Sequence, residues 1–176
     1  RRHTRYISVT GVQTCALPIS GRCEHAFEWF DVRALLDDLA EYYAPLVSMS
    51  GMDLRIEAEP GRELYGDRAL LFQALSNLLE NAIRHGRPPV AMSGERTARG
   101  IRIAVSDAGP GLQPRLVDRV FDRFAHAGPA AGSGLGLYLV REIARLHGGE
   151  ASYVDSGSGR PAFVLDLPAQ PEIPRS

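Results

Sequence analysis

Three short stretches of this chain carry the residues that could do chemistry, and they occur in a set order. They are Asn-Leu-Leu-Glu-Asn at 77–81, Asp-Ala-Gly-Pro-Gly at 107–111 and Gly-Ser-Gly-Leu-Gly-Leu at 132–137. Carboxamide oxygens suit a hard cation such as Mg²⁺, and glycine-rich turns leave backbone N–H groups free to meet phosphate oxygens. In this order the three stretches predict a pocket for ATP and Mg²⁺.

The first stretch lies on a helix predicted over about 67–85. Asn77, Asn81 and Arg84 fall at i, i+4 and i+7, so they share one face of this helix beside its apolar face. Arg84, one turn beyond Asn81, could meet phosphate charge. The alternative is an ordinary solvated face on which Glu80 and Arg84 form an i, i+4 ion pair.

The second stretch places Asp107 at the end of a predicted strand, followed by Gly109 and Gly111. A carboxylate there can accept a hydrogen bond from the exocyclic amine of adenine. Glycines without a Cβ let the backbone approach the ring. The alternative is a plain turn, because Asp and Gly are both favoured in turns.

The third stretch opens a predicted helix, where free N–H groups and the helix dipole favour an anion. It is not a Walker loop, because no Gly-Lys-Ser/Thr follows, and it lacks the context of a dinucleotide fingerprint. Small residues at 125–131 precede it and resemble a flap. A flexible loop before an ordinary helix is the alternative.

Hydrophobic periodicity predicts the elements that position these stretches. Helices are expected over about 31–48, 67–85 and 135–146, and strands over 53–59, 90–93, 101–106, 150–155 and 162–167, with a turn at 94–100. Asp67 is expected to cap the second helix, and Gly86 to end it. Helices and strands are intermixed, which predicts an α/β fold with a mixed sheet covered on one face by helices.

The composition is that of a globular domain, with 44% hydrophobic and 23% charged residues and a formal net charge of −1. This balance argues against a nucleic-acid partner. Only Cys15 and Cys23 are present, so no zinc or disulfide framework is expected, and a cytoplasmic location fits. No apolar run reaches the length of a bilayer-spanning helix. An inner-membrane anchor upstream of this sequence is left open for the intact protein.

Residues 1–20 differ in kind from the rest of the chain. Residues 9–19 (Val-Thr-Gly-Val-Gln-Thr-Cys-Ala-Leu-Pro-Ile) resemble a translated sequencing-library adapter, and residues 1–5 match its outer part. We therefore expect 1–20 to be an artefact whose removal leaves folding intact. A native N-terminal strand is the alternative. The domain is assigned to 21–168, with a frayed tail at 169–176.

Together the stretches resemble the boxes of sensor histidine kinases. Residues 77–84 resemble the N box and 107–111 the first glycine box. Val-Phe-Asp-Arg-Phe at 120–124 resembles the F box, and 132–137 the second glycine box. The likeness covers about residues 27–168. It implies the Bergerat fold, a two-layer α/β sandwich whose mixed, mostly antiparallel sheet carries three helices on one face, with an ATP lid before the last box.

The resemblance also implies roles for individual residues. Asn81 would hold Mg²⁺, Asn77 would support the metal and the phosphates, and Arg84 would contact phosphate as the third member of the catalytic set. His85 would lie over the adenine, and Asp107 would read its amine. The other implied nucleotide-binding residues are Gly109, Gly111, Arg123, Gly132, Gly134, Leu135 and Gly136.

Two departures from the family pattern bear on the activity. The lid at 125–131 is short and poor in Arg and Ser. No phosphoacceptor box occurs in the sequence, and the residues around His25 do not resemble one. The resemblance therefore implies an upstream helical hairpin that dimerises the intact protein and carries the acceptor histidine. A response regulator would receive the phosphoryl group next. The alternatives are a regulatory nucleotide-binding module without phosphotransfer and an anti-sigma-type serine kinase. His147 is expected to be a helix-terminal contact rather than a ligand.

Overall fold

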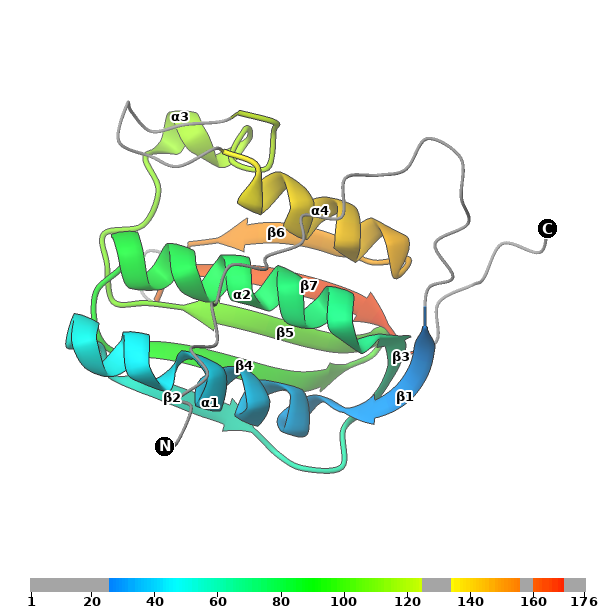
Figure 1. The fold of residues 1–176 in the computed structure, drawn as a ribbon. Helices are drawn as coiled ribbons and strands as arrows, with labels where there is room; N and C mark the ends of the chain where they lie inside the picture. Colours follow the sequence, from blue (N-terminus) through cyan, green and yellow to red (C-terminus); the bar gives the residue numbers. More distant parts are fainter. Residues whose placement is uncertain (1–25, 125–133, 156–159, 170–176) are drawn as a thin grey trace, which may run out of the picture.

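The computed structural model describes residues 26–124, 134–155 and 160–169. Figure 1 shows two layers, a twisted sheet and long helices that lie side by side across one of its faces. The elements, in chain order, are β1 (Phe27–Asp31), α1 (Val32–Ser50), β2 (Leu54–Ala58), β3 (Glu63–Asp67), α2 (Arg68–His85), β4 (Val90–Thr97), β5 (Gly100–Ser106), α3 (Pro114–Val117), α4 (Gly136–Leu146), β6 (Glu150–Val154) and β7 (Ala162–Pro168). The predicted α/β sandwich is confirmed.

The main sheet has the strand order β2-β4-β5-β7-β6. β2 pairs with β4 in parallel, and the other three pairings are antiparallel. Side chains along β5 alternate between the two faces, so Ile101 and Ile103 are buried while Arg102 is exposed. Because β4 and β5 are antiparallel, the end of β5 and the residues that follow it lie beside the start of β4, at one end of the strands.

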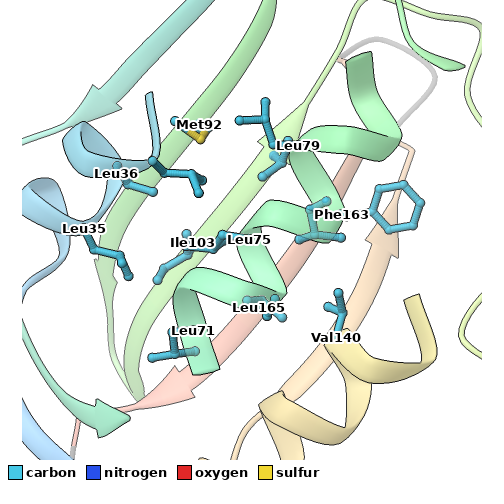
Figure 2. Close-up of a cluster of buried hydrophobic side chains, with 14 of the residues drawn as sticks. Leu35, Leu36, Leu71, Leu75, Leu79, Met92, Ile103, Val140, Phe163 and Leu165 are labelled. Atoms are coloured by element: carbon cyan, nitrogen blue, oxygen red, sulfur yellow. The ribbon is translucent and has the colours of Figure 1, made fainter. Parts of the chain in front are cut away.

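The hydrophobic core fills the space between the sheet and the helices, as Figure 2 shows. Leu71, Leu75 and Leu79 stand at helical spacing on α2 and are fully buried. Around them lie Leu35 and Leu36 of α1, Val140 of α4, and Met92, Ile103, Phe163 and Leu165 of the sheet. The burial of this stripe fixes the rotation of α2, so its polar face lies at the flank of the core.

The ends of the first two long helices are capped by side chains and a glycine. Asp67 Oδ1 accepts a hydrogen bond from the Leu70 N–H at 3.0 Å, as predicted for the start of α2. Asp31 Oδ1 accepts from the Arg33 N–H at 2.7 Å at the start of α1. Gly51 ends α1 with a φ of 68°, a left-handed conformation that suits glycine.

The predicted turn at 94–100 is wrong in its extent, because β4 continues to Thr97. Gly94 pairs with Ile103 inside the ladder. A Cβ on Gly94 would lie 2.9 Å from Val32 Cγ1, so this glycine allows α1 to approach the sheet closely. Gly94 therefore serves the packing of α1 on the sheet and not the turn.

A second sheet of two strands, β1 and β3, was not predicted, and neither was the short helix α3. β1 and β3 pair antiparallel, and Tyr65 contacts Phe27 and Trp29 with ring centroids 5.8 and 5.4 Å apart. The pairing joins segments separated by α1 and β2, so no local pattern reveals it. In the part of the chain that the structure describes, no helix is long and apolar enough to cross a membrane.

Candidate functional site

Helices α2 and α4 lie antiparallel, and this arrangement brings Asn77 to the N-terminus of α4. A Cβ on Gly136 would lie only 3.1 Å from Asn77 Oδ1. At the other end of the pair, His147 Nε2 accepts a hydrogen bond from the Asp67 N–H at 2.9 Å. The first turn of α4, with its unpaired N–H groups, therefore lies against the polar face of α2.

The polar face of α2 is not the ordinary ion-paired surface that was the alternative. Asn77 Nδ2 donates to the Gln73 carbonyl at 3.1 Å, which leaves Oδ1 on the side of α4. Asn81 is partly buried, and its side chain has no hydrogen bond within the described residues. Glu80 accepts from the Tyr43 hydroxyl at 2.7 Å and so points toward α1, with no ion pair to Arg84. Two carboxamides and a guanidinium are left on this face.

This donor set fits a metal that arrives with a phosphate chain. Across residues 26–124, 134–155 and 160–169, no group of three or more His, Cys, Asp or Glu side chains could hold a metal ion. Mg²⁺ keeps several waters and commonly takes only one or two protein oxygens beside substrate phosphates. The side-chain oxygen of Asn81 can supply one such ligand, whereas a resident metal would need more.

Asp107 lies where β5 ends beside the C-terminus of α2. Its Oδ1 accepts hydrogen bonds from the Gly109 N–H at 2.6 Å and the Arg87 N–H at 3.2 Å. A Cβ on Gly86 would lie 2.6 Å from Asp107 Cγ, so only glycine allows this approach. These bonds orient the carboxylate and leave Oδ2 without a hydrogen-bond partner in the described structure.

The glycine loop after Asp107 is held from the other side by β6. Gly111 has a φ of 74°, and a Cβ there would lie 2.6 Å from both Tyr153 Oη and Asp155 Oδ2. The Leu112 N–H donates to the Tyr153 hydroxyl at 2.8 Å. Burial raises the pKa of Tyr153, and the nearby carboxylates of Asp155 and Asp107 raise it further. Sequence reasoning missed Tyr153, because an aromatic residue in an alternating strand has the pattern of a core residue.

Arg123 lies against the first turns of α4. Its guanidinium lies 5.4 Å from the Phe124 ring centroid and 5.5 Å from that of Tyr138. The Phe124 N–H donates to the Gly134 carbonyl at 3.2 Å, and Gly134 has a φ of 64°. The F-box segment is thereby joined to the residues that begin α4.

Three other predicted site residues lie at or beside the ends of the helices. Arg84 and His85 are exposed on the last turn of α2, where positive charge suits the helix dipole. Leu135 precedes α4 and is 38% exposed. The predicted lid at 125–131 and Gly132 lie outside the described residues.

His147 is a structural residue, and the expected helix-terminal contact is present. The residue is 1% exposed, and Nδ1 of its ring lies 2.7 Å from the Ile143 carbonyl. Because Nε2 accepts from the Asp67 N–H, the ring is the neutral tautomer that donates through Nδ1. A Cβ on Gly66 would lie 2.8 Å from His147 Cδ2, so glycine makes room for the ring.

An open hollow of about 680 Å³ lies at the other end of the sheet and contains none of the predicted site residues. It is lined by the turn between β4 and β5, the start of β6 and the end of β7, including Arg102 and Asp166. Arg102 Nε donates to Asp166 Oδ1 at 2.8 Å. Arg102 and Asp166 therefore neutralise each other at the opposite end of the sheet from Asp107.

Residues 66–171 match the family of Histidine kinase-, DNA gyrase B-, and HSP90-like ATPases. The chain belongs to this family. It is 39% identical over 123 residues to the signal transduction histidine-protein kinase AfsQ2 of Streptomyces coelicolor, an alignment that covers 68% of this chain and 23% of AfsQ2. It is 33% identical over 151 residues to the sensor protein IrlS of Burkholderia pseudomallei, covering 82% of this chain and 32% of IrlS.

Solved structures show the same fold. The ATP binding domain of PrrB from Mycobacterium tuberculosis has a TM-score of 0.66 and 32% identity, and the match covers 81% of this chain and 96% of that one. The catalytic domain of the histidine kinase ThkA has a TM-score of 0.74 over 82% of this chain and 97% of that one, at 23% identity, which shows the fold alone. The predicted resemblance to the ATP-binding domain of sensor histidine kinases is confirmed. The chain spans about a quarter to a third of the curated relatives named above.

Proposed function

We propose that this domain binds Mg·ATP along the polar face of α2. In the intact protein it would pass the γ-phosphoryl group to a histidine of an upstream dimerisation domain. The observation that carries this proposal is the pair of features at the two ends of that face. The Oδ2 oxygen of Asp107, which no described group hydrogen-bonds, lies at one end, and the N-terminus of α4 beside Asn77 lies at the other. From Asn77 to the cap at Gly86 the helix rises ~13 Å, at 1.5 Å per residue. This length separates the adenine base, at the Asp107 end, from the phosphate chain, at the Asn77 end.

The adenine end is formed by Asp107 and the residues beside it. Asp107 Oδ2 accepts a hydrogen bond from the exocyclic amine, because Oδ1 is already engaged by the Gly109 and Arg87 N–H groups. Gly109 and Gly111 bring backbone close to the ring. His85, next to the Gly86 cap, lies over the adenine.

The phosphate end is formed by α2 and the start of α4. The N–H groups of the first turn of α4 meet the phosphate oxygens, and the glycine box (Gly132, Gly134, Leu135 and Gly136) shapes this end of the site. Asn81 holds Mg²⁺ and Asn77 supports the metal and phosphates, while Arg84 and Arg123 add positive charge. Bound Mg²⁺ neutralises charge that develops on the transferred group. The rest of the catalysis is positioning, since no nucleophile is required from this domain.

The partners follow from the same proposal. The acceptor histidine belongs to the protein's own dimerisation domain, so the intact protein is a homodimer, and a response regulator receives the phosphoryl group. The names of the relatives support the histidine kinase activity, and a neighbouring structure of ThkA in complex with the response regulator protein TrrA supports the response regulator as a partner. The domain works in the cytoplasm, and an upstream segment of the intact protein anchors it in the inner membrane.

Two measurements test the proposal in sequence. Calorimetric titration of the chain with ADP and a non-hydrolysable ATP analogue, with and without Mg²⁺, should give saturable binding that the metal strengthens. A folded protein that binds neither nucleotide would refute the site. Incubation with ATP and a purified histidine-hairpin domain should then give acid-labile phosphohistidine. Acid-stable phosphoserine on a partner would point to a serine kinase, and binding without transfer to a regulatory module.

A further inference from the structure

We propose that Tyr153 is a positioning residue for base recognition, although it lies on β6 and outside every motif of the sequence. Its hydroxyl fixes the loop from Gly109 to Leu112 and thereby the orientation of Asp107. This inference rests on the proposed nucleotide site and names a residue that determines how well the site reads the base.

The tyrosine ring is itself held firmly. Tyr153 packs against Phe163 with ring centroids 5.2 Å apart, and Phe163 is buried and contacts Phe121 edge-on at 5.9 Å. Aromatic pairs of this kind add stability beyond the area they bury. The hydroxyl of Tyr153 is therefore presented from a rigid strand and a rigid core.

That hydroxyl contacts the loop directly. It accepts a hydrogen bond from the Leu112 N–H at 2.8 Å. Burial raises the pKa of Tyr153, and the Asp155 carboxylate lies close enough to raise it further. Because the Leu112 N–H can only donate, the hydroxyl oxygen is the acceptor and its proton points away from that N–H. Gly111 passes so close that a Cβ would lie 2.6 Å from the hydroxyl oxygen and from Asp155 Oδ2. The loop thus rests on this pair of side chains.

The same loop is tied to Asp107 at its other end. The Gly109 N–H donates to Asp107 Oδ1 at 2.6 Å, three residues before Leu112. A loop this short moves as a unit, so release at Leu112 shifts the Gly109 N–H as well. The carboxylate then loses its orientation, and the base contact weakens while the phosphate end, on α2 and α4, is left unchanged.

The experiment compares two variants that each remove one hydroxyl. Tyr153→Phe removes the partner of Leu112, and Tyr43→Phe is the matched control, because the Tyr43 hydroxyl bonds Glu80 at 2.7 Å on the α1 side of α2. Calorimetry gives the Kd of Mg·ADP and of Mg·tripolyphosphate, which has no base. We expect Tyr153→Phe to weaken ADP binding about three- to tenfold, the usual effect of one lost hydrogen bond, with tripolyphosphate binding unchanged. Tyr43→Phe should change neither.

Amide NMR of the ligand-free protein provides a second readout that does not depend on nucleotide. The Gly109 and Leu112 amide signals should shift in Tyr153→Phe and stay in place in Tyr43→Phe. If the wild type fails to bind ADP, the proposed function is wrong, and a shift of both signals still supports the loop contact. If the wild type binds and Tyr153→Phe binds ADP equally well, or loses ADP and tripolyphosphate alike, the positioning role is overturned.

Discussion

Replacing Asp107 by Asn tests the base-reading contact with the smallest possible change. Oδ1 of Asp107 receives two backbone donors, from Gly109 at 2.6 Å and Arg87 at 3.2 Å. An Asn at 107 must keep its carbonyl oxygen there, because its NH₂ group would face two N–H groups. The NH₂ group therefore replaces Oδ2, and a donor meets the adenine amine where an acceptor is needed.

The expected loss follows from this geometry. A hydrogen bond to a charged group contributes about 1.5–3 kcal/mol, and each 1.4 kcal/mol changes an affinity about tenfold. The Kd of ADP should therefore rise roughly tenfold to a hundredfold in Asp107→Asn. Both backbone hydrogen bonds are retained, so the free energy of unfolding should change by less than about 1 kcal/mol.

The assay is calorimetric titration of wild type and Asp107→Asn with ADP and with inosine diphosphate, after urea denaturation shows both to be folded. Inosine carries a carbonyl oxygen in place of the amine, so the variant should discriminate less between the two bases, or prefer inosine. An ADP affinity equal to that of the wild type would refute the assignment of Asp107. An equal loss for both nucleotides would show that the variant disturbs the site generally.

Three further predictions concern the metal, the stability of the helix pair and the effect of alkaline pH. Asn81→Ala should abolish the strengthening of ATP-analogue binding by Mg²⁺, while the binding of ADP without metal persists. Calorimetric titrations with Mg²⁺ and with EDTA measure both quantities. An unchanged effect of Mg²⁺ in the variant would argue against Asn81 as the metal ligand. His147→Leu should lower the free energy of unfolding by about 2–3 kcal/mol, because it removes the hydrogen bond from the buried Asp67 N–H to the His147 ring. A loss below about 0.5 kcal/mol in urea denaturation would contradict a stabilising role for this hydrogen bond. Burial, and to a lesser degree Glu80, raises the pKa of Tyr43 to about 12. The folded state then holds this proton more tightly than the unfolded state, so stability should fall as pH rises from about 10 to about 12. That fall should be smaller in Tyr43→Phe, and an identical pH profile would count against the buried phenol.

Much of the fold could be predicted because its signals are local. The apolar stripe of α2 repeats at helical spacing, and Asp67 caps the helix through a bond to a residue three positions on. The alternation along β5 and the glycine at the end of α1 are local in the same sense. Each of these features depends on residues within a few positions of one another.

The errors arose where a contact joins distant segments. β1 and β3 pair across α1 and β2, and Gly94 is explained by Val32 rather than by its own neighbours. Tyr153 contacts Leu112 from 41 positions away. A pattern search along the chain cannot distinguish such residues from ordinary strand or turn residues.

The sequence by itself determined which residues share the polar face of α2 and which stretches belong to the family, because helical geometry and motif order need no tertiary contact. Only the tertiary structure decided how the site is assembled. It set Gly136 against Asn77, turned one oxygen of Asp107 toward two backbone donors, and placed Tyr153 under the glycine loop. The physical reason is that these contacts depend on the antiparallel packing of α2 and α4 and on the register of β5, β7 and β6, which the burial of the whole core imposes together.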